Sequence, residues 1–216
     1  MTVPREIGDL PFASALRPFE GSLAAGEDYE CYHFADLTFD DIPAGNYRFL
    51  ECAFSNVALE GGRMRKSRFS DTWLRDVRLV ATDLAETGWL DATLIGCAAA
   101  GVQAFEASLW RVSFHDCKLD SVNFRGATLN EVTFENCLLR DTDFGSARLK
   151  RTRFPGSRLT GADFTKATLE DVDLRGAELG ITAGYESLHG ATIDSVQLVT
   201  LAPLLAHHLG VTVKDD

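Results

Sequence analysis

The chain has 216 residues, of which 45% are hydrophobic and 25% charged, so its composition excludes a disordered protein and favours a soluble domain with a true core. Its 21 basic and 32 acidic residues give a net charge of −11, which repels phosphate backbones and argues against direct nucleic-acid binding. The sequence contains no run of 18 uncharged apolar residues, and its first residues do not show a basic region followed by an apolar run. We therefore expect a cytoplasmic protein with no membrane segment.

Residues 1–30 show no periodic pattern and contain three prolines, Pro4, Pro11 and Pro18. A regular repeat begins directly after them and occupies residues 31–182. An open stack of repeats exposes unpaired strand edges at its ends, which must be covered to prevent aggregation. We therefore predict that residues 1–30 form an N-terminal cap.

The repeat has a period of five residues. From Phe34 to Leu179, 27 of the 30 positions five apart carry Phe, Leu, Met or Trp. The exceptions are alanines: Ala44, Ala99 and Ala104. The residue two places before each, from Cys52 to Ala177, is always small, and in an extended segment it shares a face with the large one. The remaining positions are rich in turn-forming Gly, Asp, Asn and Ser. A chain that turns a corner every five residues winds into an all-β solenoid with that face inside.

The repeats resemble those of a known family. The segments 127–131 (Ala-Thr-Leu-Asn-Glu) and 162–166 (Ala-Asp-Phe-Thr-Lys) are similar to the A(D/N)LXX signature of pentapeptide repeat proteins, and the resemblance extends over roughly residues 30–195. It implies a right-handed quadrilateral β-helix in which four pentapeptides make one coil. Thirty repeats then correspond to about 7.5 coils.

With 20 residues in each coil, side chains 20 positions apart should stack by type. The phenylalanines that form two such columns are Phe114, Phe134 and Phe154, and Phe124, Phe144 and Phe164. Leucines fill the other two walls. Three cysteines with the same spacing, Cys97, Cys117 and Cys137, occupy small inward positions. A metal site is the alternative to simple packing, but three thiols along one wall cannot surround a tetrahedral ion, so we predict no metal.

The pattern is irregular between residues 89 and 110. Here Trp89, Ala99 and Ala104 occupy inward positions, while apolar side chains occupy outward ones: Leu90, Ile95, Phe105 and Trp110. One interpretation is that these outward apolar residues, which fall within about one coil, form a patch of the kind that marks a partner site. The alternative is a bulged coil that takes Phe105 inside in place of Ala104.

Residues 183–216 depart from the repeat. The register slips by one after Gly180, and Asp194 to Gln197 resembles a capping box that opens a helix. Leucines at helical spacing follow: Leu198, Leu201, Leu204, Leu205 and Leu209. Pro203 should kink or restart this helix, and Gly210 suits its end. The helix either covers the last coil or also joins two copies, as it does in the Qnr and MfpA types of the family, and we expect both, with these leucines at a homodimer contact.

The resemblance also implies a function, because the Qnr and MfpA types bind DNA gyrase or topoisomerase IV by imitating duplex DNA. One outward column should read Glu51, Asp71, Asp91 and then alternate in sign, so these three acids are candidate contacts. A basic cluster opposes mimicry: Arg148, Lys150, Arg151, Arg153 and Arg158. The alternative is a general protein-interaction scaffold that binds an unknown partner through the acidic coils or through Leu90, Phe105 and Trp110.

We predict no enzymatic activity, no catalytic residue and no cofactor. None of the five histidines falls in a metal-protease, nucleophile-elbow or phosphate-loop pattern. A coil interior filled with side chains also leaves no concave pocket for convergent catalytic groups. The expected partner is therefore a protein, with a type II topoisomerase as the candidate.

Overall fold

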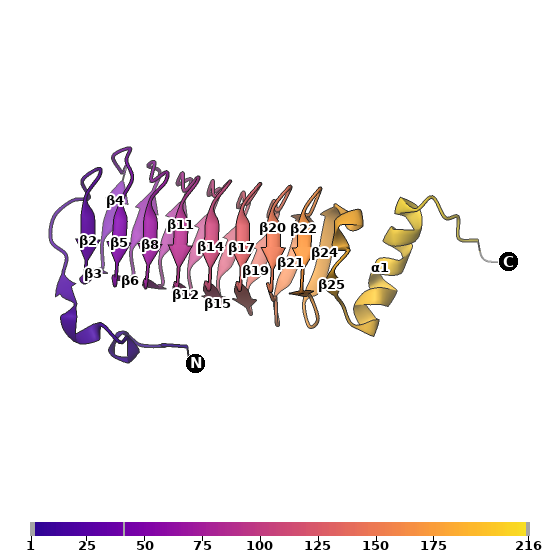
Figure 1. Cartoon of the computed structure of the whole chain (residues 1–216), viewed down its shortest axis with the longest axis horizontal. Coiled ribbons are helices and arrows are strands. Elements are labelled where there is room, and N and C mark those ends of the chain that lie inside the picture. The colour runs from indigo at the N-terminus through magenta and orange to yellow at the C-terminus, as the bar shows by residue number, and fades with distance from the viewer. Residues whose placement is uncertain (1–2, 41, 215–216) are drawn as a thin grey trace.

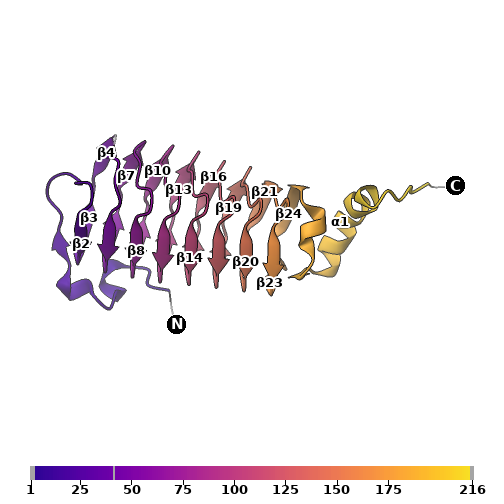
Figure 2. The ribbon, with the colours of Figure 1, turned by 45° about the horizontal axis from the view of Figure 1, so that its top comes forward.

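The computed structural model describes residues 3–40 and 42–214, which form a straight rod with a helix at its C-terminal end (Figure 1). Short parallel strands stack along the rod, one coil after another. The N-terminal segment leaves the first coil and runs back along one side of the rod, as both views show (Figures 1 and 2). The predicted four-sided β-solenoid with a helical C-terminal end is confirmed.

In three of the four pentapeptides of a typical coil, a three-residue strand with a buried centre is followed by a corner, and in the fourth a single bridged residue replaces the strand. The residue two places after the buried centre has a positive φ in coil after coil, for example 53° at Asn136, 49° at Asp141 and 65° at Gly156. Asp, Asn and Gly tolerate this left-handed conformation best, which explains why they recur there. The corner N–H then donates to the next coil, as in the 2.9 Å bond from Asn136 N to Pro155 O. The sequence of the corner thus sets the winding.

Faces 1 and 2 of the rod, numbered in the order in which the chain meets them, are parallel ladders. Face 1 contains β1 (Arg17–Pro18), β3 (Tyr32–Ala35), β6 (Ala53–Ser55), β9 (Trp73–Arg75), β12 (Thr93–Ile95), β15 (Ser113–His115), β18 (Thr133–Glu135), β23 (Val172–Asp173) and β25 (Ala191–Thr192). Face 2 contains β4 (Thr38–Asp40), β7 (Ala58–Glu60), β10 (Arg78–Val80), β13 (Ala98–Ala100), β16 (Lys118–Asp120), β19 (Leu138–Arg140), β21 (Arg158–Asp163) and β24 (Glu178–Ala183).

Faces 3 and 4 complete the square. Face 3 is held by single-residue bridges that join positions 63, 83, 103, 123, 143 and 163. Face 4 is an eight-stranded ladder: β2 (Asp28–Glu30), β5 (Arg48–Leu50), β8 (Arg68–Ser70), β11 (Gly88–Leu90), β14 (Ser108–Trp110), β17 (Thr128–Asn130), β20 (Arg148–Lys150) and β22 (Thr168–Glu170). Partners on these ladders lie 20 residues apart, so the predicted coil length is confirmed.

The core consists of the predicted columns. On face 1 the ring centres of Phe114 and Phe134 are 4.7 Å apart and nearly parallel. On face 3 the ring of Phe144 stacks between those of Phe124, at 5.5 Å, and Phe164, at 5.1 Å. Offset stacking of this kind adds to the gain from burial, so each ring stabilises the coils on both sides of it.

The coil that contains Ala99 and Ala104 keeps its register. Leu79, Ala99 and Leu119 are successive partners on face 2, and Ala104 is buried. The interpretation as a bulged coil is therefore wrong, and Phe105 stays outside the core. The two alanines instead leave an apolar cavity of about 40 Å³ beside the indole of Trp89. This coil is the least well filled of the central rod.

We predict that Ala99→Leu raises the free energy of unfolding by about 1 kcal/mol, because it extends the leucine column into the cavity. Urea denaturation followed by circular dichroism measures the change. Ala98→Leu adds the same atoms to the outward, half-buried position of the same strand and serves as the control. A loss of stability in Ala99→Leu would show that the cavity is too small for the side chain.

The C-terminal end closes the rod. After β24 come a 3-10 turn, η3 (Tyr185–Leu188), and α1 (Ser195–His208). The predicted capping box is present, since Gln197 N donates to Asp194 Oδ1 at 2.9 Å and Asp194 N to Gln197 Oε1 at 2.9 Å. Gln197 Nε2 also donates to the carbonyl of Leu174 at 2.6 Å, which fixes the helix to the last full coil.

The helix runs through Pro203 without restarting, so that part of the expectation is wrong. The helix ends at His208, and Gly210, directly after the C-cap residue Leu209, has a φ of 70° that terminates it as predicted. The N–H of Val211 donates to the carbonyl of Ala206 at 2.8 Å, which completes a Schellman motif. Within residues 3–40 and 42–214, no helix has the length and apolar character needed to cross a membrane.

Candidate interaction surfaces

The N-terminal strap, defined as residues 3–16, covers the first half of face 1. It contains the 3-10 turns η1 (Ile7–Asp9) and η2 (Ala13–Ala15). Leu10 and Phe12 of the strap pack with Ala53, Trp73 and Ile95, which point outward from face 1. This contact corrects the sequence interpretation of Ile95 as part of an exposed patch. The signal was present in the sequence, because three outward apolar residues on one face require a cover.

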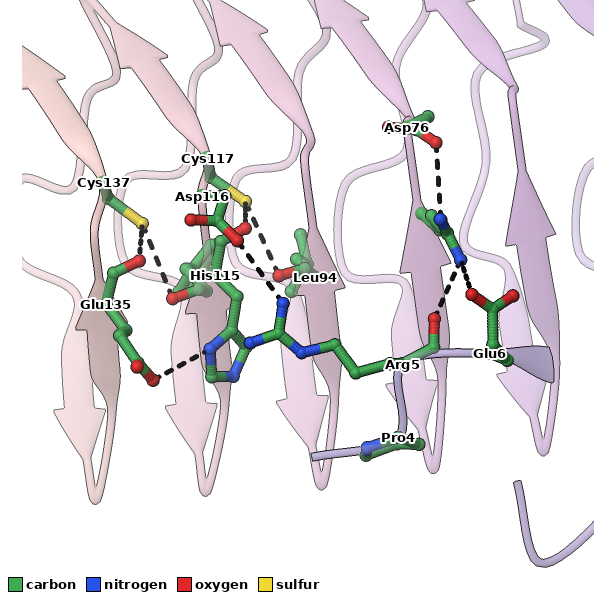
Figure 3. Close-up of polar contacts among 12 residues, drawn as sticks. Pro4, Arg5, Glu6, Asp76, Leu94, His115, Asp116, Cys117, Glu135 and Cys137 are labelled. Atoms are coloured by element: carbon green, nitrogen blue, oxygen red, sulfur yellow. Dashed lines mark hydrogen bonds and ion pairs between the residues drawn. The ribbon is translucent and has the colours of Figure 1, made fainter. Parts of the chain in front are cut away.

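Polar contacts extend the strap along the rod (Figure 3). Trp73 Nε1 donates to the carbonyl of Pro4 at 3.0 Å, and Arg75 Nη1 donates to the carbonyl of Arg5 at 2.9 Å. The Arg75 guanidinium also lies 2.9 Å from the Glu6 carboxylate, and the guanidinium of Arg5 reaches Asp116 at 3.7 Å. The strap therefore reaches as far as β15, and the covered part of face 1 is not available to a partner.

His115 lies beneath the end of the strap and is buried. Its Nδ1 is 3.1 Å from Glu135 Oε2 on the next strand of the same face (Figure 3). No other histidine or nucleophile converges on it among the contacts of the described residues. The geometry is that of a buried histidine in a structural contact.

The cysteine column packs as one wall of the interior. The thiol of Cys117 lies 3.3 Å from the carbonyl of His115, and that of Cys137 lies 3.3 Å from the carbonyl of Glu135 (Figure 3). A hydrogen bond with Cys117, together with burial, holds the pKa of Cys97 well above its ordinary value. Burial likewise raises the pKa of Cys52 to about 11. The part of the chain that the structure describes contains no cluster of three metal-binding side chains.

The predicted acidic column forms the corner between faces 4 and 1. Glu51, Asp71 and Asp91 succeed one another there, each with a positive φ. Asp91 is paired with Arg111 through bonds of 2.6 and 2.7 Å, whereas Glu51 accepts a contact of 3.4 Å from the thiol of Cys31. Burial raises the pKa of Asp71 above its ordinary value of 3.8, and the carboxylates of Asp91 and Glu51 raise it further. Uncompensated negative charge is therefore concentrated at Glu51 and Asp71.

We predict that Asp71→Asn raises the melting temperature at pH 7. The folded state holds the Asp71 proton more tightly than the unfolded state, so ionised Asp71 lowers stability as pH rises from 3.8 through the raised pKa. The gain from the substitution should shrink as the pH falls below 3.8. Thermal unfolding over a series of pH values tests this, with Asp141→Asn at the diagonally opposite corner as the control for the loss of one charge.

A gain that stays the same at every pH would contradict the prediction. Asparagine tolerates the left-handed conformation at this position, so the substitution itself introduces no backbone strain.

The basic cluster does not stay together. Side chains at these positions point from different faces, and most have acidic partners on neighbouring coils. The pairs are Lys150 with Glu170, Arg151 with Glu131, and Arg158 with Glu178. Arg153 lies near Asp173, whose pKa is lowered chiefly by its hydrogen bond to Arg175. Arg148 and Arg153 have no ion pair within 4.0 Å among the described residues. The cluster therefore opposes mimicry less than the sequence suggested.

The apolar patch that the sequence predicted is smaller than expected. Leu90 and Trp110 are adjacent partners on face 4 and are 40% and 44% exposed. Phe105 belongs to face 3, where the guanidinium of Arg65 lies 5.2 Å from its ring centre. The structure thus brings together Leu90 and Trp110 and places Phe105 under a cation on another wall.

The leucines of α1 divide into two groups. Leu201 is 1% exposed and packs against the last coil, so it belongs to the cap and cannot form the predicted dimer contact. Leu205 is partly buried, while Leu198, Leu204 and Leu209 are exposed. Val196 and Val199, which the sequence interpretation did not include, are also exposed. The outer side of the helix is therefore apolar over several turns.

Comparison with known proteins agrees with this geometry. Residues 107–183 match a family model described as a pentapeptide repeat region. The coils before residue 107 have the same five-residue unit and the same register between neighbouring coils. Residues 107–183 therefore form a pentapeptide repeat region. No curated protein is similar enough in sequence to count as a match.

Solved structures of other pentapeptide repeat proteins are similar to the chain. A trypsin-treated form of QnrB1, a plasmid-mediated fluoroquinolone resistance protein, is 15% identical over 88% of this chain and 100% of its own, with a TM-score of 0.39. HetL from the cyanobacterium Nostoc, involved in heterocyst differentiation regulation, is 19% identical over 78% and 90%, with a TM-score of 0.27. A pentapeptide repeat protein of the Arabidopsis thaliana thylakoid lumen is 18% identical over 60% and 75%, with a TM-score of 0.27. Similarity at this level says nothing about partners.

Proposed function

We propose that this pentapeptide repeat protein has no catalytic activity and acts by binding another protein on the outer walls of its rod. The observation that carries the proposal is the filled interior. The inward columns form one continuous core, and the largest enclosed apolar space among the described residues measures about 40 Å³. The larger hollows are open grooves on the surface, such as that between Arg111 and Asp173 on face 1. Recognition by such a molecule takes place on its surface.

The partner class that we propose to test first is a type II topoisomerase. Residues 1–60 contain 11 acidic and 3 basic residues, a net charge of −8. Glu51 in this segment and Asp71 one coil farther along have no ion-pair partner among the described contacts. An exposed row of negative charges along a rod favours binding to a positively charged protein surface, such as one that binds DNA. Beyond Asp91 the column is neutralised by Arg111 and Arg151, so mimicry would be confined to the first coils.

We predict that the protein at micromolar concentration inhibits DNA supercoiling by purified gyrase. A double variant, Glu51→Gln with Asp71→Asn, should require about tenfold more protein for the same inhibition, since it removes the unpaired charges and keeps the coil. Asp71→Asn alone is compared with Asp141→Asn, which also removes one exposed charge but from the opposite corner. Gel analysis of plasmid topoisomers gives the readout.

Two results would count against mimicry by the acidic corner. Equal inhibition by the wild type and the double variant would place the contact elsewhere on the rod. The absence of inhibition would remove gyrase as the partner and leave the general scaffold, which also binds a protein but not this one.

We further propose that α1 joins two copies end to end. Its outer side exposes large apolar side chains, among them Val199 at 74%, and a two-fold contact would cover the same residues in both copies. Such a contact would place the acidic first coils at the two far ends of a longer rod.

We predict that the wild type elutes as a dimer, with twice the monomer mass of 23.6 kDa, and that Val199→Glu elutes as a monomer. A carboxylate buried without a partner opposes association strongly. Size-exclusion chromatography with light scattering measures the mass. Leu90→Glu, which introduces the same group on face 4, is the control and should remain a dimer. A monomeric wild type at about 100 μM would contradict the proposal.

A further inference from the structure

Face 4 differs from the rest of the rod in the charge of its outward side chains. From β5 to β20 every charged side chain that points outward from this face is a cation: Arg48, Arg68, Arg148 and Lys150. Acidic side chains point outward only from the terminal strands of the face, namely Asp28 and Glu30 on β2 and Glu170 on β22. A protein with a net charge of −11 thus carries one wall that has no outward acid from β5 to β20.

Two of these cations are free to bind a ligand. Arg48 pairs with Asp28 at 2.9 Å, and Lys150 pairs with Glu170. Arg68 and Arg148 have no ion-pair partner within the described residues. Arg68 extends across the position of Gly88, where an added Cβ would lie 2.6 Å from Arg68 Nη1. The guanidinium of Arg68 therefore lies along the wall and not out into solvent.

Apolar side chains lie between the two free arginines. Leu90 and Trp110 are exposed neighbours on β11 and β14. Beyond Trp110, a shallow groove of about 220 Å³ continues over Thr128 and Asn130 toward Arg148. The groove thus begins at an exposed indole and passes Arg148, a cation without a partner, before it ends at the paired side chains of Lys150 and Glu170.

We propose that this part of face 4 binds an extended segment of a partner protein that carries an apolar side chain next to one or two carboxylates. The apolar side chain would lie against Leu90 and Trp110, and a carboxylate would pair with Arg148. Exposed tryptophan and arginine are the residues that most often dominate binding energy at protein interfaces. The inference rests on the proposed function as a protein-binding rod and names the surface and the chemistry of the partner.

The position of the acidic corner indicates how the segment is oriented. Glu51 and Asp71 flank the N-terminal part of face 4, whereas Glu131, on the same corner farther along, is neutralised by Arg151. Carboxylates of the partner are therefore repelled near β5 and β8 and accepted near β20. A nucleic acid is disfavoured, because its phosphates would meet the net negative charge of the whole rod.

Fluorescence titration of the full chain tests the proposal, because Trp110 is the exposed tryptophan while Trp73 and Trp89 are 2% and 9% exposed. The probes are synthetic 12-residue peptides with a central Leu or Phe next to two Glu or Asp residues. Matched peptides replace either the central apolar residue by Ser or the acids by Lys. A single-stranded 12-nucleotide DNA is added as a further probe.

We expect acidic peptides with the apolar residue to bind and to change the emission of Trp110, and both matched peptides to bind at least about tenfold more weakly. Calorimetry should show a similar loss for Trp110→Ala and Arg148→Glu. Arg63→Glu makes the same charge change on face 3, where Arg63 is exposed, and should bind like the wild type. Circular dichroism confirms that each variant is folded.

Three outcomes would overturn the inference. The first is that no acidic peptide with an apolar residue binds at millimolar concentration. The second is binding that survives both Trp110→Ala and Arg148→Glu, which would support protein binding but place it on another wall. The third is tighter binding of the DNA than of every peptide, which would identify a nucleic-acid surface. The gyrase experiment tests a different surface. If the double variant of Glu51 and Asp71 loses inhibition, that result supports the acidic corner and does not depend on any of these three outcomes.

Discussion

The structure depends on a corner that recurs every five residues, in which one residue adopts a left-handed conformation and donates its N–H to the next coil. Asn136, with a φ of 53° and a bond to Pro155, shows the unit. Every corner turns the same way, so each coil has the same perimeter. The interior of each coil therefore holds one large and one small side chain from each wall. Where two walls contribute only alanine, at Ala99 and Ala104, the shared geometry leaves a cavity and does not collapse.

A filled interior places recognition on the outside, and the outer surfaces differ in chemistry. The strap covers half of face 1, charges of opposite sign neutralise much of the corner columns, and face 4 combines cations with Trp110. The apolar outer side of α1 is a further surface. These surfaces lie on different sides of one rigid rod, so a partner on face 4 and a second copy at α1 would not compete for the same residues.

Much of the fold was predictable because the repeat is local. The position of Phe144 in its pentapeptide decides that it faces the axis, and its distance of 20 residues from Phe124 and Phe164 decides that they stack. The capping box at Asp194 and the end of α1 at Gly210 were equally local signals. The strap was not predictable in this way, since the contact between Pro4 and Trp73 joins residues 69 apart, and no period connects them.

The sequence by itself determined the coil, its four walls and the column to which each side chain belongs, because a five-residue period fixes direction without any distant contact. Tertiary structure decided which outward residues remain exposed. Ile95 is covered and Leu90 is not, although both are outward apolar residues of the same coil, because the strap crosses face 1 and leaves face 4 open. Leu201 is buried and Leu198 exposed for the same kind of reason, since only the docking of α1 on the last coil determines which side of the helix is inward.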